Sequence, residues 1–336
     1  MSLSSIINNI PKAELHLHIE GSLTPELMWR LAKKHSVTLP YASVKEIEAA
    51  YNFEDLQSFL DLYYAGAGVL RDEEDFFTLM WEYLSRCYKE NIVHTEIMFD
   101  PQTHTERDIG FDVFMPGFLR AMDKAKQEYG ISSYLIMSFL RHLPESAAFE
   151  TLSEAEPYYK HITAVGLDSS ELGHPPSKFE RVFKKAKSLG FKIVAHAGEE
   201  GPASYIWEAI ELLDVDRIDH GVRCQEDKAL MALLRERQIP LTVCPLSNLK
   251  LCVIDDMKQH NIVELLNEGL LVTVNSDDPT YFGGFLNDNF VALQESLDID
   301  EDTIRTLAAN SFKSSFLPED VKRSFVEKVF NVRKNL

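Results

Sequence analysis

Short apolar runs alternate with longer amphipathic stretches along most of the chain. Several of the runs are almost continuously apolar, which is typical of parallel strands buried on both faces of a sheet. We expect strands at residues 13–18, 93–99, 133–139, 163–167, 193–196, 217–220, 241–244 and 271–275. The pattern therefore predicts an α/β protein built on a parallel sheet.

The stretches between these runs have helical periodicity. In residues 178–189, apolar side chains recur every three or four positions, and Gly190 follows where a helix C-cap is expected. Gly130 and Gly269 hold equivalent places before the third and eighth strands. Strands and helices that alternate in this way over 336 residues predict a (β/α)8 TIM barrel, with residues 1–336 as a single domain.

The first crossover, residues 19–92, is too long for one helix. It contains three helical patterns, at residues 25–35, 53–65 and 73–89. Insertions after a barrel strand lie at the mouth of the barrel, so we expect a helical lid; the alternative is that the insertion only plugs the barrel end. Residues 299–336 predict two or three C-terminal helices packed outside the barrel.

The chain is acidic, with 34 Lys and Arg against 53 Asp and Glu and a formal net charge of −19. This charge disfavours binding to the phosphate backbone of a nucleic acid or to an anionic membrane surface. We expect a neutral or cationic small molecule, or another protein, as the partner. The sequence does not indicate whether the chain forms a homo-oligomer.

The cysteines and the N-terminus predict a cytoplasmic location. Four cysteines without CxxC spacing favour a reducing compartment over a disulfide framework. Residues 1–11 lack the charged and apolar regions of a secretory signal. No apolar run approaches the roughly 20 residues of a transmembrane helix.

Histidine and aspartate residues follow four of the predicted strands. These strand ends read His16-Leu17-His18, His196-Ala197-Gly198-Glu199, Asp219-His220-Gly221 and Asn275-Ser276-Asp277-Asp278. Each residue alone is compatible with a structural role, such as a buried hydrogen bond or a helix N-cap. Because parallel barrel strands all end at one mouth, the four ends together indicate a site for a divalent metal.

These residue types are suited to metal-assisted hydrolysis. Three imidazoles and one carboxylate are ligands that hold zinc, which lowers the pKa of a bound water to about 7. We expect His220 to orient that water, Glu199 to donate a proton to the substrate and Asp278 to bind the substrate. Residues 166–171, at the end of the fourth strand, contain no lysine that would bridge two metals, so a single metal ion is favoured.

Four ordered motifs resemble the adenosine and adenine deaminases, a branch of the amidohydrolase superfamily. The resemblance runs over residues 11–316. Its motifs are Pro11-Lys12-Ala13-Glu14-Leu15-His16-Leu17-His18-Ile19-Glu20-Gly21-Ser22, His196-Ala197-Gly198-Glu199, Arg217-Ile218-Asp219-His220-Gly221 and Ser276-Asp277-Asp278-Pro279.

This resemblance implies a role for each strand-end residue. It implies one Zn²⁺ ion per chain, held by His16, His18, His196 and Asp277. It also implies that Glu199 protonates purine N1, that His220 positions the attacking water and that Asp278 contacts purine N7. The implied reaction is attack of zinc hydroxide at purine C6 with loss of ammonia.

Two positions depart from the adenosine branch and look like the adenine branch. Glu20 stands where aspartate is usual at the ribose end of the pocket, and Ser169-Ser170-Glu171 replaces a glycine-containing segment. We expect Glu20, Ser170 and Glu171 to bind the substrate, with the longer carboxylates filling the space of a ribose and accepting a hydrogen bond from base N9–H. The alternative is that Glu20 and Glu171 are solvated or touch the lid. The implied function is zinc-dependent deamination of adenine to hypoxanthine and ammonia.

Other functions are compatible to different degrees. The same scaffold serves enzymes that act on adenosine, an N6-substituted adenine or a larger adenine-containing metabolite, and fold and metal do not separate these substrates. The small zinc deaminases of cytosine and nucleic acids need a PCxxC element, which this chain lacks. A non-catalytic barrel would have lost a metal ligand or the proton donor, and all of these residues are present.

Overall fold

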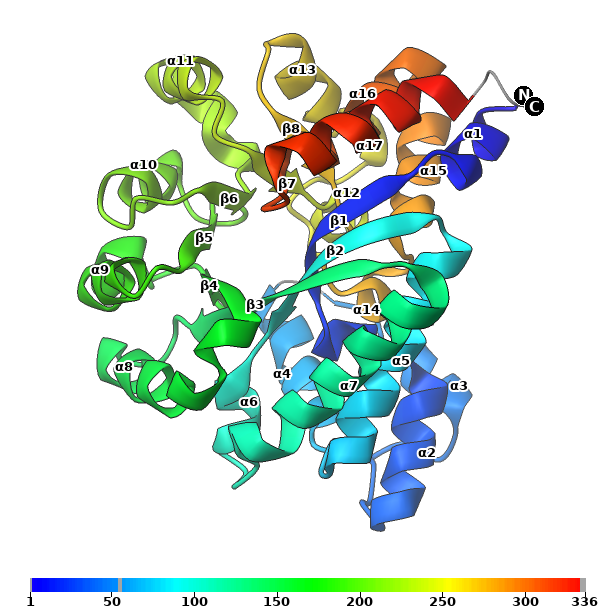
Figure 1. Cartoon of the computed structure of the whole chain (residues 1–336), viewed down its shortest axis with the longest axis vertical. Coiled ribbons are helices and arrows are strands. Elements are labelled where there is room, and N and C mark those ends of the chain that lie inside the picture. Colours follow the sequence, from blue (N-terminus) through cyan, green and yellow to red (C-terminus); the bar gives the residue numbers. More distant parts are fainter. Residues whose placement is uncertain (1, 54–55, 333–336) are drawn as a thin grey trace.

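The computed structural model describes residues 2–53 and 56–332. At its centre is an eight-stranded sheet whose strands follow one another in sequence order, each parallel to the next (Figure 1). The strands are β1 (Lys12–His18), β2 (Ile92–Phe99), β3 (Ser132–Leu140), β4 (Ile162–Asp168), β5 (Lys192–Ala197), β6 (Arg217–His220), β7 (Leu241–Val243) and β8 (Val272–Val274). The predicted (β/α)8 barrel is confirmed, and every predicted strand overlaps an observed one.

The barrel closes between β8 and β1 at a short seam. Leu17 pairs with Asp277 in a parallel bridge just beyond β8. The His18 N–H donates to the Asp277 carbonyl at 3.0 Å, and the Asp277 N–H donates to the His16 carbonyl at 3.1 Å. The same backbone bonds that close the barrel therefore hold Asp277 beside the two histidines at the end of β1.

Helices cover the outside of the barrel, which is why the strands are nearly continuous in apolar residues. The long helix of the second crossover, α7 (Phe111–Tyr129), ends at Gly130 with a left-handed φ of 72°, as its predicted C-cap requires. The other helices of the crossovers after β2 are α6 (Pro101–Thr105), α8 (Glu145–Glu154), α9 (Glu180–Ser188), α10 (Ala203–Glu211), α11 (Lys228–Arg237), α12 (Pro245–Lys250) and α13 (Ile262–Asn267).

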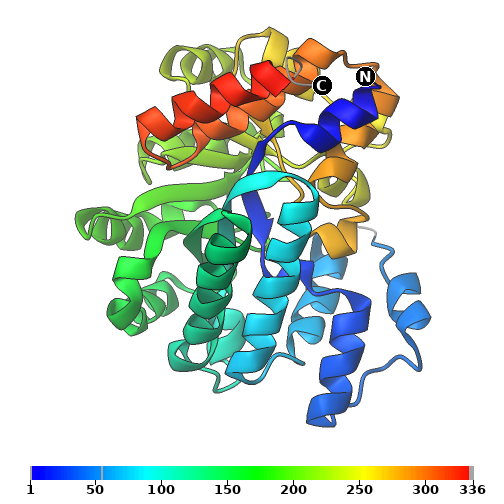
Figure 2. The ribbon, with the colours of Figure 1, turned by 45° about the vertical axis from the view of Figure 1, so that its right-hand side comes forward.

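The insertion between β1 and β2 is helical, as predicted. It contains the 3-10 turn η1 (Glu20–Ser22) and the helices α2 (Pro25–His35), α3 (Val44–Ala49), α4 (Leu56–Ala67) and α5 (Glu73–Lys89). The sequence pattern did not predict α3, and residues 54 and 55 of the predicted range 53–65 lie outside the described residues. In both views α2, α3 and α4 lie at the end of the molecule away from α17 (Figures 1 and 2).

The helices α1 (Leu3–Asn9), α16 (Glu301–Ser314) and α17 (Glu319–Asn331) lie at the other end of the barrel (Figure 1). Between β8 and α16 the chain forms α14 (Pro279–Phe282), which packs against η1 at the mouth, and α15 (Leu286–Leu297) on the outside. Behind α16, the N–H of Phe316 donates to Glu96 at 2.5 Å, and the buried Arg217 pairs with the same carboxylate at 2.6 Å. This end is filled by side chains, so chemistry is confined to the opposite mouth.

None of the helices in the described residues is long and apolar enough to cross a membrane. The cysteines are unpaired: Cys87, Cys224 and Cys244 are buried and Cys252 is exposed.

Candidate active site

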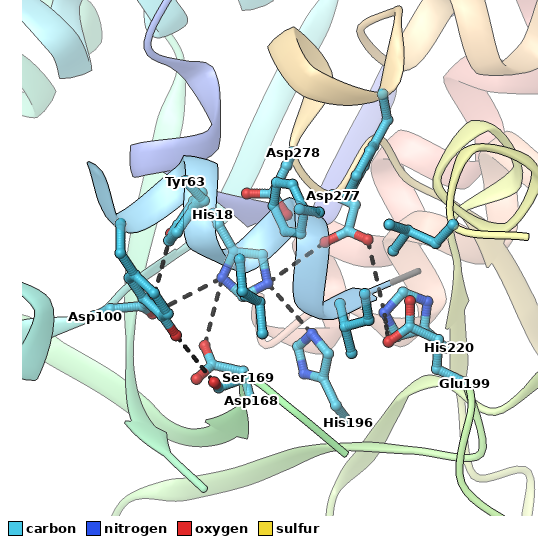
Figure 3. A pocket seen from close by; sticks show the side chains of 16 residues that line it. His18, Tyr63, Asp100, Asp168, Ser169, His196, Glu199, His220, Asp277 and Asp278 are labelled. Carbon is cyan, nitrogen blue, oxygen red and sulfur yellow. Dashed lines mark hydrogen bonds and ion pairs between the residues drawn. The ribbon is translucent and has the colours of Figure 1, made fainter. Parts of the chain in front are cut away.

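Four predicted metal ligands meet at the mouth of the barrel. His16 and His18 come from β1, His196 from β5 and Asp277 from the seam after β8, and one ligand atom from each lies within 4.8 Å of the others. His16 and His18 reach the same side because residues two apart on a strand share a face. All four side chains are buried, with His18, His196 and Asp277 converging in Figure 3.

The spacing of these atoms is that of ligands which share a single metal ion. Ligands held 2.0–2.1 Å from zinc are separated from one another by roughly 3.3–3.4 Å. Here the Nε2 atoms of His16 and His196 lie 3.1 Å apart, and those of His18 and His196 lie 3.3 Å apart. Asp277 Oδ1 lies 3.3 Å from His16 Nε2 and 3.5 Å from His18 Nε2. The donor set and its spacing therefore fit one zinc ion.

The other ring nitrogen of each histidine faces an oxygen acceptor. This arrangement keeps a proton on Nδ1 and leaves the Nε2 lone pair free for a metal. The nearest acceptor atoms are Thr242 Oγ1, 3.0 Å from His16 Nδ1, Asp168 Oδ2, 3.4 Å from His18 Nδ1, and Asp219 Oδ2, 3.6 Å from His196 Nδ1. Thr242 Oγ1 also donates to Asp219 Oδ1 at 2.8 Å, so one carboxylate supports two of the predicted ligands.

Beside the ligand cluster lie the predicted proton donor and its neighbour. Glu199 Oε2 is 3.5 Å from His220 Nε2, and the same imidazole nitrogen is 3.7 Å from Asp277 Oδ2 (Figure 3). Burial raises the pKa of Glu199 well above its usual value, and the charge of Asp277 raises it further. Burial lowers the pKa of His220 well below its usual value. Both shifts are in the direction that favours a protonated carboxyl and a neutral imidazole, as a proton donor and a water-orienting base require.

Asp278 lies on the other side of the cluster. Its carboxyl is packed over Gly21, where a Cβ atom would come within 1.9 Å of Asp278 Oδ1, so the close approach requires glycine. Burial raises the pKa of Asp278 well above its usual value against the opposing charge of His18. A protonated Asp278 can donate a hydrogen bond into the pocket.

Three pocket residues have a left-handed backbone without being glycine. The φ angles are 73° at Ser169, 62° at His220 and 63° at Asp277. Such conformations cost about 1–3 kcal/mol each and concentrate at functional sites. At β6 the turn also overrides strand alternation, because Asp219 and His220 both face the metal-ligand cluster although they are adjacent in the chain.

Of the four predicted substrate contacts, Asp278 is among the residues that line the pocket, whereas Glu20, Ser170 and Glu171 are not. Glu20 is buried, with Oε1 2.7 Å from His104 Nε2 and 3.3 Å from the Asp100 N–H, and with Oε2 accepting from the Tyr63 hydroxyl at 3.5 Å. Its carboxylate is engaged by protein groups rather than solvated. Direct contact of Glu20 with the base remains a prediction.

The segment after β4 differs in detail from the expected arrangement. Ser169, not Ser170, lines the pocket, and Ser170 is partly buried beside it. Glu171 is fully buried, and its two carboxylate oxygens accept hydrogen bonds from the backbone of residues 198–201. The alternative that Glu171 is solvated is therefore wrong, its oxygens accept from backbone groups, and its direct contact with the substrate remains a prediction.

Tyr63, Phe59 and Leu60 were candidates from the sequence for a wall over the substrate, whereas the other pocket residues described next were not predicted. Tyr63 and Tyr64 come from α4; the Tyr63 hydroxyl donates to Asp100 Oδ2 at 3.1 Å, and the Tyr64 hydroxyl lies 2.9 Å from Ser169 Oγ. Asp100 and Asp168 lie at the ends of β2 and β4, a position that is itself a usable signal in a parallel barrel. The remaining pocket wall is apolar and consists of Leu56, Phe59, Leu60, Leu251 and Phe282.

Comparisons with known proteins identify the family of the chain. The family model for adenosine deaminase matches residues 11–332. An adenine deaminase of Acinetobacter baylyi is 59% identical over 329 residues, which cover 98% of this chain and 99% of the relative. An adenine deaminase of Wolinella succinogenes is 58% identical over 328 residues, 98% of this chain and 99% of the relative. The crystal structure of an adenine deaminase from Arthrobacter aurescens, 46% identical, matches with a TM-score of 0.95 over 97% of this chain and 99% of that chain.

Proposed function

The chain belongs to the adenosine deaminase family and is a hydrolytic deaminase, and we propose that it converts adenine to hypoxanthine and ammonia with one zinc ion bound per chain. The observation that carries the proposal is a single pocket in which a zinc-type ligand cluster adjoins two buried carboxyl groups, Glu199 and Asp278, whose pKa values burial raises. The similarity to adenine deaminases over nearly the whole chain supports this choice of substrate.

The residues divide the work of the reaction. Zinc held by His16, His18, His196 and Asp277 supplies a Lewis acid that activates water. Glu199 donates a proton to purine N1 as water adds at C6, and the neutral His220 orients that water and accepts its proton. Asp278 donates a hydrogen bond to purine N7, which only its protonated form can do. His220 then passes its proton to the 6-amino group, which leaves as ammonia, and the proton of the C6 hydroxyl returns to Glu199.

We propose that α4 restricts the pocket to a free base. Tyr63 reaches Asp100 at the end of β2, and Tyr64 reaches Ser169 after β4, so two hydrogen bonds tie the insertion across the mouth. A substrate that extends past the base would have to break these bonds, at a cost of about 1 kcal/mol each. We therefore propose that α4 is the predicted lid. It covers the bound substrate and opens to admit substrate and release product.

An ammonia-release assay tests the proposal. The purified protein is given adenine or adenosine, with and without a zinc chelator, and N6-methyladenine, which would release methylamine, is followed by hypoxanthine formation instead. We expect rapid, chelator-sensitive turnover of adenine and slow turnover of the other two. Equal or faster deamination of adenosine would refute the adenine assignment, and full activity after verified zinc removal would refute the metal assignment. The four unpaired cysteines support a reducing, cytoplasmic setting for this activity.

A further inference from the structure

We propose that Glu171 is a positioning residue for Glu199, an inference that rests on the proposed function. The fully buried carboxylate of Glu171 accepts the backbone N–H groups of four consecutive residues. The distances are 2.7 Å from Gly198 N to Oε1, and 3.1, 2.9 and 2.7 Å from Glu199, Glu200 and Gly201 N to Oε2. The segment that carries the proton donor is thus wrapped around one anion.

The backbone of this segment is shaped to fit that anion. Gly198 has a φ of 73°, and a Cβ atom there would lie 2.4 Å from Ile206 Cδ1. A Cβ atom at Gly201 would lie 2.5 Å from Glu171 Oε1. Successive N–H groups that converge in this way form an anion-binding concavity, which is here filled by a side chain of the protein itself.

Three carbonyl groups in and just before the same segment accept hydrogen bonds from two arginines. Arg141 Nη1 donates to the His196 carbonyl at 2.7 Å, and Arg223 donates to the Gly198 carbonyl through its backbone N–H at 3.0 Å. The Arg223 guanidinium also donates to the Glu200 carbonyl. Glu199 therefore sits on a backbone that is fixed from both sides, which leaves its carboxyl few directions other than toward the pocket and His220.

This role differs from substrate binding. Oε2 of Glu171 accepts three of the four backbone N–H groups and Oε1 accepts the fourth, so both carboxylate oxygens already have partners within the protein. The negative charge of Glu171 also helps to raise the pKa of Glu199, after burial and Asp277. Glu171 thus keeps the proton donor both aimed and protonated without touching the substrate.

Glu171→Gln tests the inference. Glutamine keeps the shape but puts an NH2 group against N–H donors and removes the charge. We expect kcat for adenine to fall about 10- to 100-fold with little change in KM, because a displacement of about 1 Å in a catalytic group can cost about 10²-fold. Zinc content, measured by elemental analysis, stays at the wild-type value.

Glu145→Gln is the matched control. Glu145 is another buried carboxylate that accepts backbone N–H groups, from Arg181 at 2.8 Å and Val182 at 3.0 Å, but it is not among the pocket residues. It loses comparable hydrogen bonds, so we expect a lower Tm with unchanged kcat. A kcat loss in Glu145→Gln equal to that in Glu171→Gln would show a general effect on stability and overturn the inference.

A double-mutant cycle separates positioning from a structural role. If Glu171 acts through Glu199, then adding Glu171→Gln to Glu199→Gln lowers kcat by less than about threefold further. Additive losses, or a folded Glu171→Gln with kcat within about threefold of wild type, overturn the inference.

A second variant and the wild-type enzyme complete the test. Should Glu171→Gln fail to fold, Gly201→Ala displaces the same carboxylate by a milder change, and its kcat, alone and with Glu199→Gln, decides in the same way. A wild-type enzyme that is inactive on adenine refutes the proposed function instead. The two failures are therefore distinguishable.

Discussion

We expect Asp219 to support two of the predicted metal ligands, His16 and His196. The variant Asp219→Asn tests this role. The carboxylate faces His196 Nδ1 at 3.6 Å with one oxygen and accepts from Thr242 at 2.8 Å with the other. Thr242 in turn contacts His16 Nδ1 at 3.0 Å. Although burial opposes ionisation, His196 and His16 hold the pKa of Asp219 below its usual range, so the group stays an anion.

The expected magnitude follows from the number of acceptors. Asparagine has one carbonyl oxygen for two donors, His196 and Thr242, and it has no charge to make the imidazole more basic. Loss of such an outer partner typically lowers metal affinity 10- to 100-fold. That range corresponds to about 1.4–2.7 kcal/mol of zinc-binding free energy. We expect a zinc Kd raised by this factor and normal turnover once zinc is saturating.

Competition with a chromophoric zinc chelator at fixed pH gives the Kd of each variant. Glu90→Gln serves as the control, because Glu90 is a buried carboxylate that accepts from the Asn287 N–H at 2.9 Å and is not among the pocket residues. A folded Asp219→Asn protein whose zinc Kd stays within about threefold of wild type would refute the claim that this carboxylate supports the metal ligands.

Four further outcomes follow from the same site. Glu199→Gln keeps its zinc but loses about 10²–10⁴-fold in kcat, and near-normal turnover would remove the proton-donor assignment. Only protonated Glu199 can donate, so kcat/KM falls as pH rises through its raised pKa, and the residual rate of Glu199→Gln lacks this alkaline limb. His16→Ala loses zinc, as elemental analysis after dialysis will show; retained zinc would contradict its role as a ligand. Tyr64→Phe breaks the bond to Ser169 and raises KM for adenine about fivefold, with more turnover of adenosine; unchanged constants would argue against α4 as the selective wall.

The barrel and the ligand cluster were predictable because both follow from periodicity. Apolar runs separated by helical stretches predicted parallel strands in sequence order. Because all parallel strands of a barrel end at the same mouth, polar residues at the strand ends are expected to lie close together there. His16, His18, His196 and Asp277 are close together in space because of that geometry alone. The proposed donor Glu199 lies beside them for the same reason.

The wall of the pocket was not predictable in this way. Tyr63 and Tyr64 lie on α4, a helix in the middle of the insertion that does not directly precede or follow a barrel strand. Their contacts with Asp100 and Ser169 depend on how the insertion packs over the mouth of the barrel. An apolar stripe on such a helix has the same pattern whether it covers a substrate or packs into a core. Only the docking of α4 over the mouth distinguishes the two.

The direction in which side chains point at the mouth was the other feature that the sequence did not predict. Alternation along β6 would send Asp219 and His220 to opposite faces, yet the left-handed φ of 62° at His220 brings both to the metal cluster. The residue type does not predict that turn, which costs about 1–3 kcal/mol and is imposed by the packing around it.

Glu171 shows the same limit of sequence reasoning. Its position predicted a carboxylate near the substrate. Its partners are instead the N–H groups of a segment about 30 residues away, which the β4–β5 pairing brings close to it. Residue type and spacing therefore predict which groups reach the mouth, and the turns between strands decide which of them face the substrate and which hold the others in place.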